Sequence, residues 1–111
     1  MKKLILVQKD LKVPKGNYNS FGRYKYRSAE DILEAVKPIL ILHNCLLTIS
    51  DDIVESAGKV YVKSTAKFLD GENEFLTFGF AETSEHKGMS SEQATGTASS
   101  YARKYALNGL F

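Results

Sequence analysis

Basic and aromatic side chains alternate in a short stretch near the start of the chain. The stretch contains Tyr18, Phe21, Tyr24 and Tyr26, interleaved with Arg23, Lys25 and Arg27. Cations neutralise phosphates and aromatic rings stack on bases, a combination that single-strand binders use. The same residues also suit an edge strand or extended arm whose rings pack on the core. Both interpretations stay open at this point.

Charge is divided unevenly along the chain. The 111 residues carry a formal charge of +2, yet residues 1–27 hold eight Lys or Arg residues against a single acid, Asp10. This basic arm therefore carries +7, and residues 28–111 carry −5. A near-neutral total does not itself indicate a polyanionic partner. The segregation does provide a local cationic segment.

A second basic feature is a predicted strand over residues 59–69. One parity holds small or apolar residues, and the other holds Lys59, Lys63 and Lys67 together with Tyr61 and Thr65. Alternate residues of a strand point to opposite faces. We expect a one-sided lysine ladder that either contacts phosphates or is an ordinary solvated face.

The remaining patterns predict an α+β fold in the order α-β-β-β-α, a single domain with a basic N-terminal arm or edge strand. A capping box at Ser28 begins a helix over about 28–43, in which Pro38 is expected to cause a kink or a restart. Short strand pieces over 46–49 and 53–55 flank a bend at Asp51 and Asp52. Turns at Gly58 and Asp70-Gly71 lead to strands over 59–69 and 75–82.

The last of these strands is apolar on both parities. One helix layer covers only one face of a sheet, so the other cover is expected from the arm or from a neighbouring subunit.

A final helix is predicted from about Ser91 to Leu107, after a capping box of Ser90 and Gln93. Its packing stripe is expected to contain Ala94, Ala98, Tyr101, Ala102 and Tyr105. Gly96, Ser99 and Ser100 lie on its flank with Arg103 and Lys104. Glycine and serine weaken a helix relative to alanine, so we expect this flank to allow close approach of a strand, a subunit or a phosphate backbone.

Several classes of function are disfavoured. The single Cys45 excludes an intrachain disulfide and indicates a reducing, cytoplasmic setting. The apolar runs are too short to cross a membrane. No phosphate-binding loop follows Gly88, so no bound nucleotide is expected. A cofactor or a metal ion is not expected either. The acids at 51, 52 and 55, and the Glu82 to Lys87 loop with His86, are interpreted as solvated groups. No catalytic residue is expected.

Two blocks of sequence are more specific. GMSSEQATGTASSYARKYALNGLF over 88–111, preceded by YKYRSAEDILEAVKPIL over 24–40, resembles the ERF (essential recombination function) family of phage single-strand annealing proteins. We therefore expect a single DNA-annealing core over 1–111, with a basic aromatic arm (1–27) and an α-β-β-β-α body (28–111). The C-terminal tail that family members commonly carry is expected to be absent. The resemblance further implies ATP-independent binding and annealing of single-stranded DNA in recombination and repair, by homo-oligomeric rings or filaments of the Rad type.

The resemblance also suggests where DNA is held. Arg103 and Lys104 are the first candidates for backbone contacts, and the lysine ladder is second. Two alternatives remain. A double-stranded RNA-binding domain has the same element order, although its second helix would normally begin with lysines rather than Ser90-Ser91-Glu92-Gln93. The other alternative is a non-catalytic structural or interaction protein of a phage.

Overall fold

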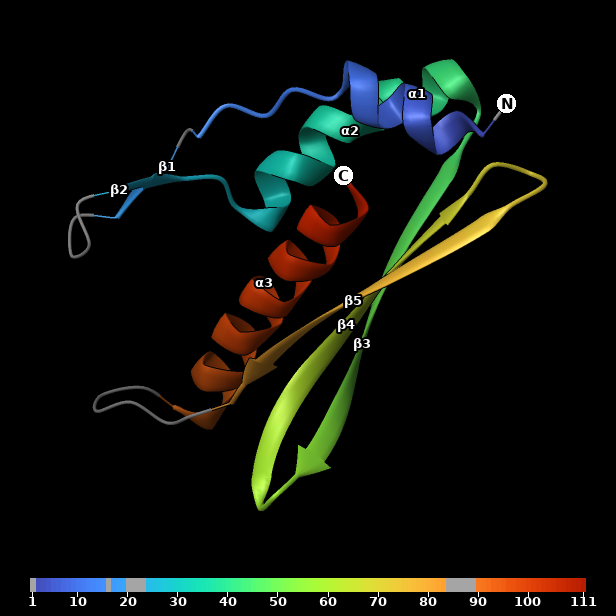
Figure 1. Cartoon of the computed structure of the whole chain (residues 1–111). Helices are drawn as coiled ribbons and strands as arrows, with labels where there is room; N and C mark the ends of the chain where they lie inside the picture. Colours follow the sequence, from blue (N-terminus) through green and yellow to red (C-terminus); the bar gives the residue numbers. More distant parts are fainter. Residues whose placement is uncertain (1, 16, 20–23, 84–89) are drawn as a thin grey trace.

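The computed structural model describes residues 2–15, 17–19, 24–83 and 90–111. The predicted α+β fold class is confirmed, with the helices and strands arranged as in Figure 1. Their bounds are α1 Lys3–Asp10, β1 Asn17–Asn19, β2 Tyr24–Tyr26, α2 Ala29–His43, β3 Leu46–Ser56, β4 Lys59–Leu69, β5 Glu74–Glu82 and α3 Ser91–Leu110. Phe21, Arg23 and the loop residues 84–89, which the sequence analysis singled out, lie outside the described residues.

The main sheet is an antiparallel meander in the order β3-β4-β5. Ala57 and Gly58 have positive φ angles of 52° and 76°, which allows a two-residue turn between β3 and β4. Asp70 closes the second turn, where its carboxylate accepts hydrogen bonds from the backbone N–H groups of Glu72 and Asn73. The predicted bend at Asp51 and Asp52 is wrong. Both residues pair in register with β4, because β3 continues without interruption to Ser56.

Both predicted capping boxes are present. Ser28 and Asp31 exchange hydrogen bonds at the start of α2, and Ser90 and Gln93 do so at the start of α3. Pro38 does not end or restart α2, which continues to His43. Asn44 then leaves the helix in the left-handed conformation, with φ at 56°.

Part of the basic arm folds as a helix. Leu4, Val7 and Leu11 recur at helical spacing, and Val7 is fully buried in the core that α2, α3 and β4 share. The Nε2 atom of His43 lies 2.8 Å from the carboxylate of Asp10, which ties the ends of α2 and α1 together. Further along the arm, β1 and β2 form a separate two-stranded sheet rather than an edge of the meander.

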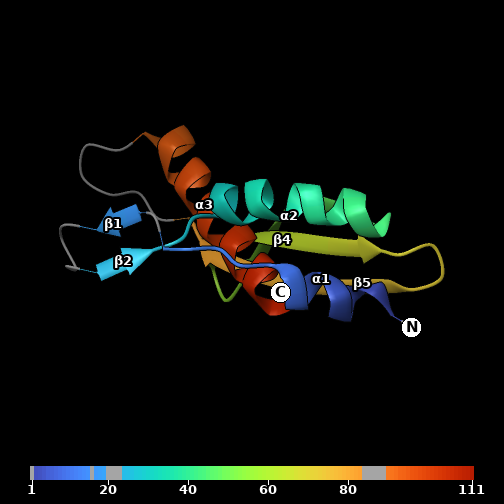
Figure 2. The same ribbon diagram turned by 90° about the horizontal axis from the view of Figure 1, so that it is seen from above.

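All three helices lie on one side of the meander, so the fold has two layers (Figures 1 and 2). The core between the layers is built around Phe68 of β4, Ile32 and Val36 of α2, and Leu107 of α3. In the part of the chain that the structure describes, no helix combines the length and the hydropathy needed to cross a membrane.

α3 contacts the sheet through alanines spaced four residues apart. Ala94, Ala98, Ala102 and Ala106 are buried, and the last two lie over Gly79 of β5. The prediction that Tyr101 and Tyr105 belong to this stripe is wrong. They are 45% and 52% exposed and stack on each other, because their positions are rotated away from the alanine row.

Gly79 is required for this contact. A Cβ added there would lie 2.6 Å from the backbone nitrogen of Ala106 and closer still to the carbonyl oxygen of Ala102. Both atoms belong to the backbone of α3, so they cannot yield without moving the helix. Gly79→Ala is therefore expected to lower the free energy of unfolding by about 1–3 kcal/mol or more. Chemical denaturation measures the change.

Gly96→Ala is the matched control. A Cβ at Gly96 meets no described atom within 4 Å, and alanine is the better helix former. We expect this variant to be more stable by about 0.5–1 kcal/mol. Equal stability of the two variants would show that α3 does not rest closely on Gly79.

Candidate nucleic-acid interface

The sheet separates the predicted basic residues onto two sides of the molecule. Val62, Ser64, Ala66 and Phe68 of β4 are buried toward the helices, so the alternate residues Lys59, Lys63 and Lys67 lie on the opposite side. We call that side the outer face. Arg103 and Lys104 belong to α3 and lie on the helical side. The two candidate groups therefore cannot line one groove within a single chain.

The lysine ladder is interrupted by acids and rings. Lys67 lies 3.8 Å from the carboxylate of Glu74, and Lys63 pairs in register with Asp52. The Lys63 ammonium also lies 4.4 Å from the ring centroid of Phe78, a cation–π contact. Successive lysines are four residues, or about 13 Å, apart along the strand, too far to share one anion. The ladder does not form a continuous cationic track.

Arg103 is held against the sheet by Asp51. Its guanidinium nitrogens lie 3.2–3.3 Å from the two carboxylate oxygens. Ser64 of β4 and Ser99 of α3 donate hydrogen bonds of 2.6 and 2.5 Å to the same carboxylate. The Asp51 cluster, made of Asp51, Ser64, Ser99 and Arg103, thus joins β3, β4 and α3. One of the two predicted backbone contacts is engaged in holding the fold together.

Partial burial would by itself raise the pKa of Asp51. Hydrogen bonds from Ser64 and Ser99, together with the charge and hydrogen bonds of Arg103, outweigh burial and hold that pKa below its usual value. Sequence reasoning interpreted Asp51 as a solvated turn carboxylate. The signal that it missed is parity, since Asp51 follows Leu47 and Ile49 on the inner side of β3.

Lys104 faces a different neighbour. With Thr97, Ser100 and Tyr101 it forms one wall of a groove of about 290 Å³, and Ser28, Ala29 and Glu30 at the start of α2 form the other. A lysine opposite a helix N-terminus favours an anion, although Glu30 offsets part of that potential. Hydroxyls and the Tyr101 ring add hydrogen-bonding and stacking groups. This α2–α3 groove suits a phosphate and its attached base.

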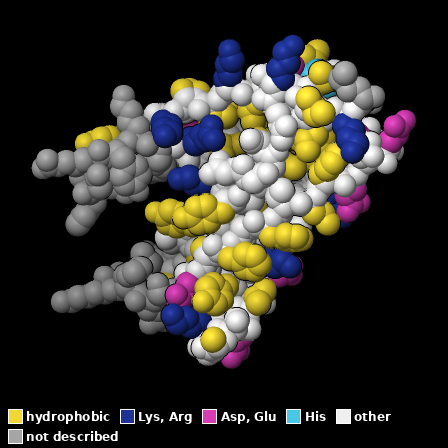
Figure 3. Space-filling view, viewed as in Figure 1, with side chains coloured by type: hydrophobic (Ala, Val, Ile, Leu, Met, Phe, Trp, Pro, Cys, Tyr) yellow, Lys and Arg dark blue, Asp and Glu magenta, His cyan; other side chains and the backbone are white. Residues whose placement is uncertain are grey.

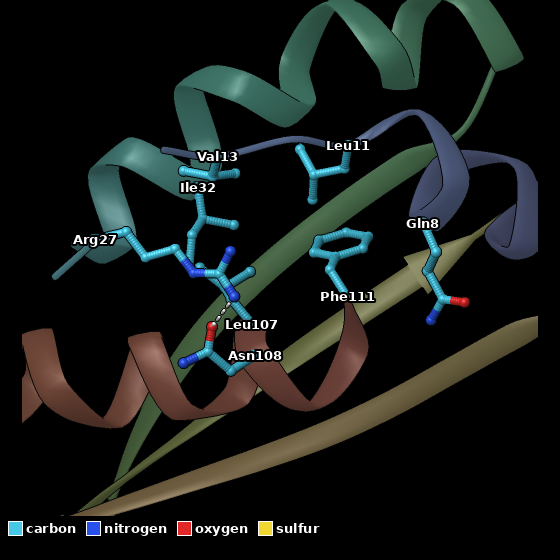
Figure 4. Close-up of a pocket in the computed structure, with 8 residues that line it drawn as sticks. All are labelled: Gln8, Leu11, Val13, Arg27, Ile32, Leu107, Asn108 and Phe111. Carbon is cyan, nitrogen blue, oxygen red and sulfur yellow. Dashed lines mark hydrogen bonds between the residues drawn. The ribbon is translucent and has the colours of Figure 1, made fainter. Parts of the chain in front are cut away.

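The basic arm leads directly into the groove. Strand β2, with Lys25 between Tyr24 and Tyr26, ends two residues before Ser28. Arg27 donates a 3.5 Å hydrogen bond to Asn108 and lines a neighbouring cavity of about 50 Å³ (Figure 4). Both polar and apolar side chains line that cavity, and its volume is far below that of a ligand pocket, so it is a packing void beside the core rather than a nucleotide pocket.

The predicted close-approach face of α3 is divided in the same way. Ser99 belongs to the Asp51 cluster, and Ser100 lines the α2–α3 groove. At Gly96 an added Cβ would meet no described atom within 4 Å outside its own stretch of helix. Figure 3 shows hydrophobic side chains in a band over α3 and β5, with basic side chains gathered near the top of the same view. Among the described residues, no group of three His, Cys, Asp or Glu side chains could hold a metal ion.

The Asp51 cluster generates a prediction about stability. Asp51→Asn removes the charge that pairs with Arg103 and is expected to lower the free energy of unfolding by about 1–3 kcal/mol at neutral pH. Since the folded-state pKa is lowered, the contribution of the carboxylate is present above the unfolded pKa of about 3.9 and is lost as the pH falls through the folded value. The difference between wild type and variant should therefore shrink in acid.

Asp52→Asn is the control, because Asp52 is the next residue along and lies on the outer face. Denaturation at pH 7 and in acid measures both variants. An equal loss for the two, or a difference that does not change with pH, would contradict the role of Asp51.

Comparisons with known proteins identify the family of this chain. The family model described as "ERF superfamily" matches residues 1–111. A curated relative, the "Essential recombination function protein" of Salmonella phage P22, is 54% identical over 110 residues, which is 98% of this chain and 53% of the relative. The chain thus spans about half the length of this relative. No solved structure gives a significant match. With the family model matching from the first residue to the last, this chain belongs to the ERF superfamily.

Proposed function

We propose that this chain binds single-stranded DNA and anneals complementary strands, without ATP, as part of homologous recombination. The single observation that carries the proposal is the α2–α3 groove, where Lys104, Tyr101 and the start of α2 meet next to the basic arm. Membership of the ERF superfamily and the name of the phage P22 relative support a role in recombination.

The proposed mechanism makes and breaks no covalent bond. Phosphates of one strand bind at Lys104 and along the arm, with Lys25 and Arg27, so that the strand is held extended. Tyr101 and Tyr105, stacked with 6.4 Å between ring centroids, offer a surface for bases. A complementary strand then pairs with the accessible base edges, and base pairing supplies the driving force.

Size supports the further proposal that several copies act together. The molecule measures 48 × 32 × 18 Å, and binding modules of comparable size cover on the order of 4–16 nucleotides. Annealing requires a longer stretch to be held in register, so we propose a homo-oligomeric ring or filament. The alternative of double-stranded RNA binding is less well supported, since α3 begins with a capping box and an acid, Glu92, rather than with lysines.

Mixing two complementary oligonucleotides, one carrying a fluorophore and the other a quencher, tests the function itself. We expect the protein to accelerate duplex formation several-fold without ATP or a metal ion. Non-complementary oligonucleotides are the control. A folded protein that binds neither strand, or that binds both and leaves the annealing rate unchanged, would contradict the proposal.

The groove makes a residue-level prediction. Lys104→Ala is expected to weaken binding of single-stranded DNA and to reduce the slope of log affinity against log salt by about 0.7, the value for one phosphate contact on a single strand. Fluorescence anisotropy at several salt concentrations measures both quantities.

Lys37→Ala is the matched control. Lys37 is an exposed lysine of α2 that pairs with Glu34. Its replacement by alanine removes one positive charge, as Lys104→Ala does. The slope of the Lys37→Ala variant should stay at the wild-type value. If the two variants have the same slope, Lys104 makes no specific phosphate contact.

A further inference from the structure

The outer face carries a row of large apolar side chains on β5. Leu76, Phe78 and Phe80 are 45%, 49% and 51% exposed, while the alternate residues of the strand face α3. Because β5 is apolar on both faces, we expect a cover on this side from the arm or from a neighbouring subunit. The described part of the arm does not cover it, because α1 packs on α2 on the helical side (Figure 1). A neighbouring subunit is therefore the cover that we infer for the outer face.

The free edge of β5 points to the same conclusion. β5 is the last strand of the sheet, and among the described residues no strand pairs with its second edge. Monomeric proteins protect such edges with lysine, proline or a bulge. The sequence EFLTFGFAE has neither lysine nor proline, and its register with β4 is unbroken from Glu74 to Glu82. Its charges lie only at the two ends.

The charge pattern distinguishes a second copy from a nucleic acid. The strand positions of the outer face contribute three lysines and three acids. These are Lys59, Lys63, Lys67, Asp52, Glu74 and Glu82. A polyanion gains little from such a balanced surface. A copy of the same surface presents charges of both signs around an apolar centre, which resembles the apolar core and polar rim of protein interfaces.

From these three observations we propose that a second copy of this chain docks on β5, burying Leu76, Phe78 and Phe80 and covering the free edge of the strand. The proposal deepens the self-association put forward under the proposed function and rests on it. DNA and the neighbouring copy then occupy opposite sides of the sheet, so a growing oligomer leaves each α2–α3 groove open.

Sedimentation velocity over a range of protein concentrations tests the interface. Phe78→Thr with Phe80→Thr keeps residues that favour strands and removes the apolar row. We expect the wild type to form species larger than the 12.4 kDa monomer, and the double variant to need at least ten times more protein to do so. Ile53→Thr with Val60→Thr is the matched control. These are also exposed apolar strand residues, near the β3–β4 turn, and the variant should behave as wild type.

A measurement on the unmodified chain covers the case in which the double variant fails to fold. Amide hydrogen exchange of β5 should slow when wild-type protein is concentrated through its association midpoint, while exchange at the β3–β4 turn stays constant. Unchanged exchange in β5 overturns the proposal. So does a folded double variant that associates like the wild type.

Three further outcomes separate this proposal from the proposed function. If the wild type associates and anneals DNA but β5 is not involved, only the interface is wrong. If the wild type stays monomeric with and without DNA, the proposed self-association fails together with the interface, and the annealing assay still decides DNA binding. If the folded double variant loses affinity for an oligonucleotide short enough to bind one copy, the outer face is a DNA surface and the proposal is overturned.

Discussion

The close contact between α3 and Gly79 determines where the side chains of the candidate site lie. A helix can approach a strand this closely only if glycine faces small residues, here Ala102 and Ala106. The hydroxyl of Thr77 donates a 2.6 Å hydrogen bond to the carbonyl oxygen of Ala106 and adds to the same contact. Together they fix the rotation of α3 about its own axis. Every other side chain of the helix takes its direction from that rotation.

Arg103 and Lys104 show the consequence. They are adjacent in sequence but about 100° apart around a helix. Arg103 is directed to Asp51 on the sheet, whereas Lys104 is directed to the start of α2. One cation stabilises the junction of β3, β4 and α3, and the other lines a groove that suits a phosphate. In our account the two neighbours therefore have different tasks, although sequence reasoning assigned them the same one.

Local patterns predicted much of the fold. The capping boxes at Ser28 and Ser90 and the alternation of residues 59–69 gave helix starts and strand faces that the structure confirms. Other features depend on contacts between distant segments. Helix α1 is short and is stabilised by burying Val7, while Asp51 acquires its role only when α3 packs beside it. Basic residues were identifiable from their types, but the division of the candidate site between two sides of a sheet was not.

We propose that DNA binds on the helical side of the sheet. Chemical modification of lysine amines, mapped by mass spectrometry with and without single-stranded DNA, tests it most directly. We expect DNA to protect Lys104 and Lys25, and the reactivity of Lys59, Lys63 and Lys67 not to depend on DNA. DNA-dependent protection of those three lysines, with Lys104 unchanged, would contradict the proposal.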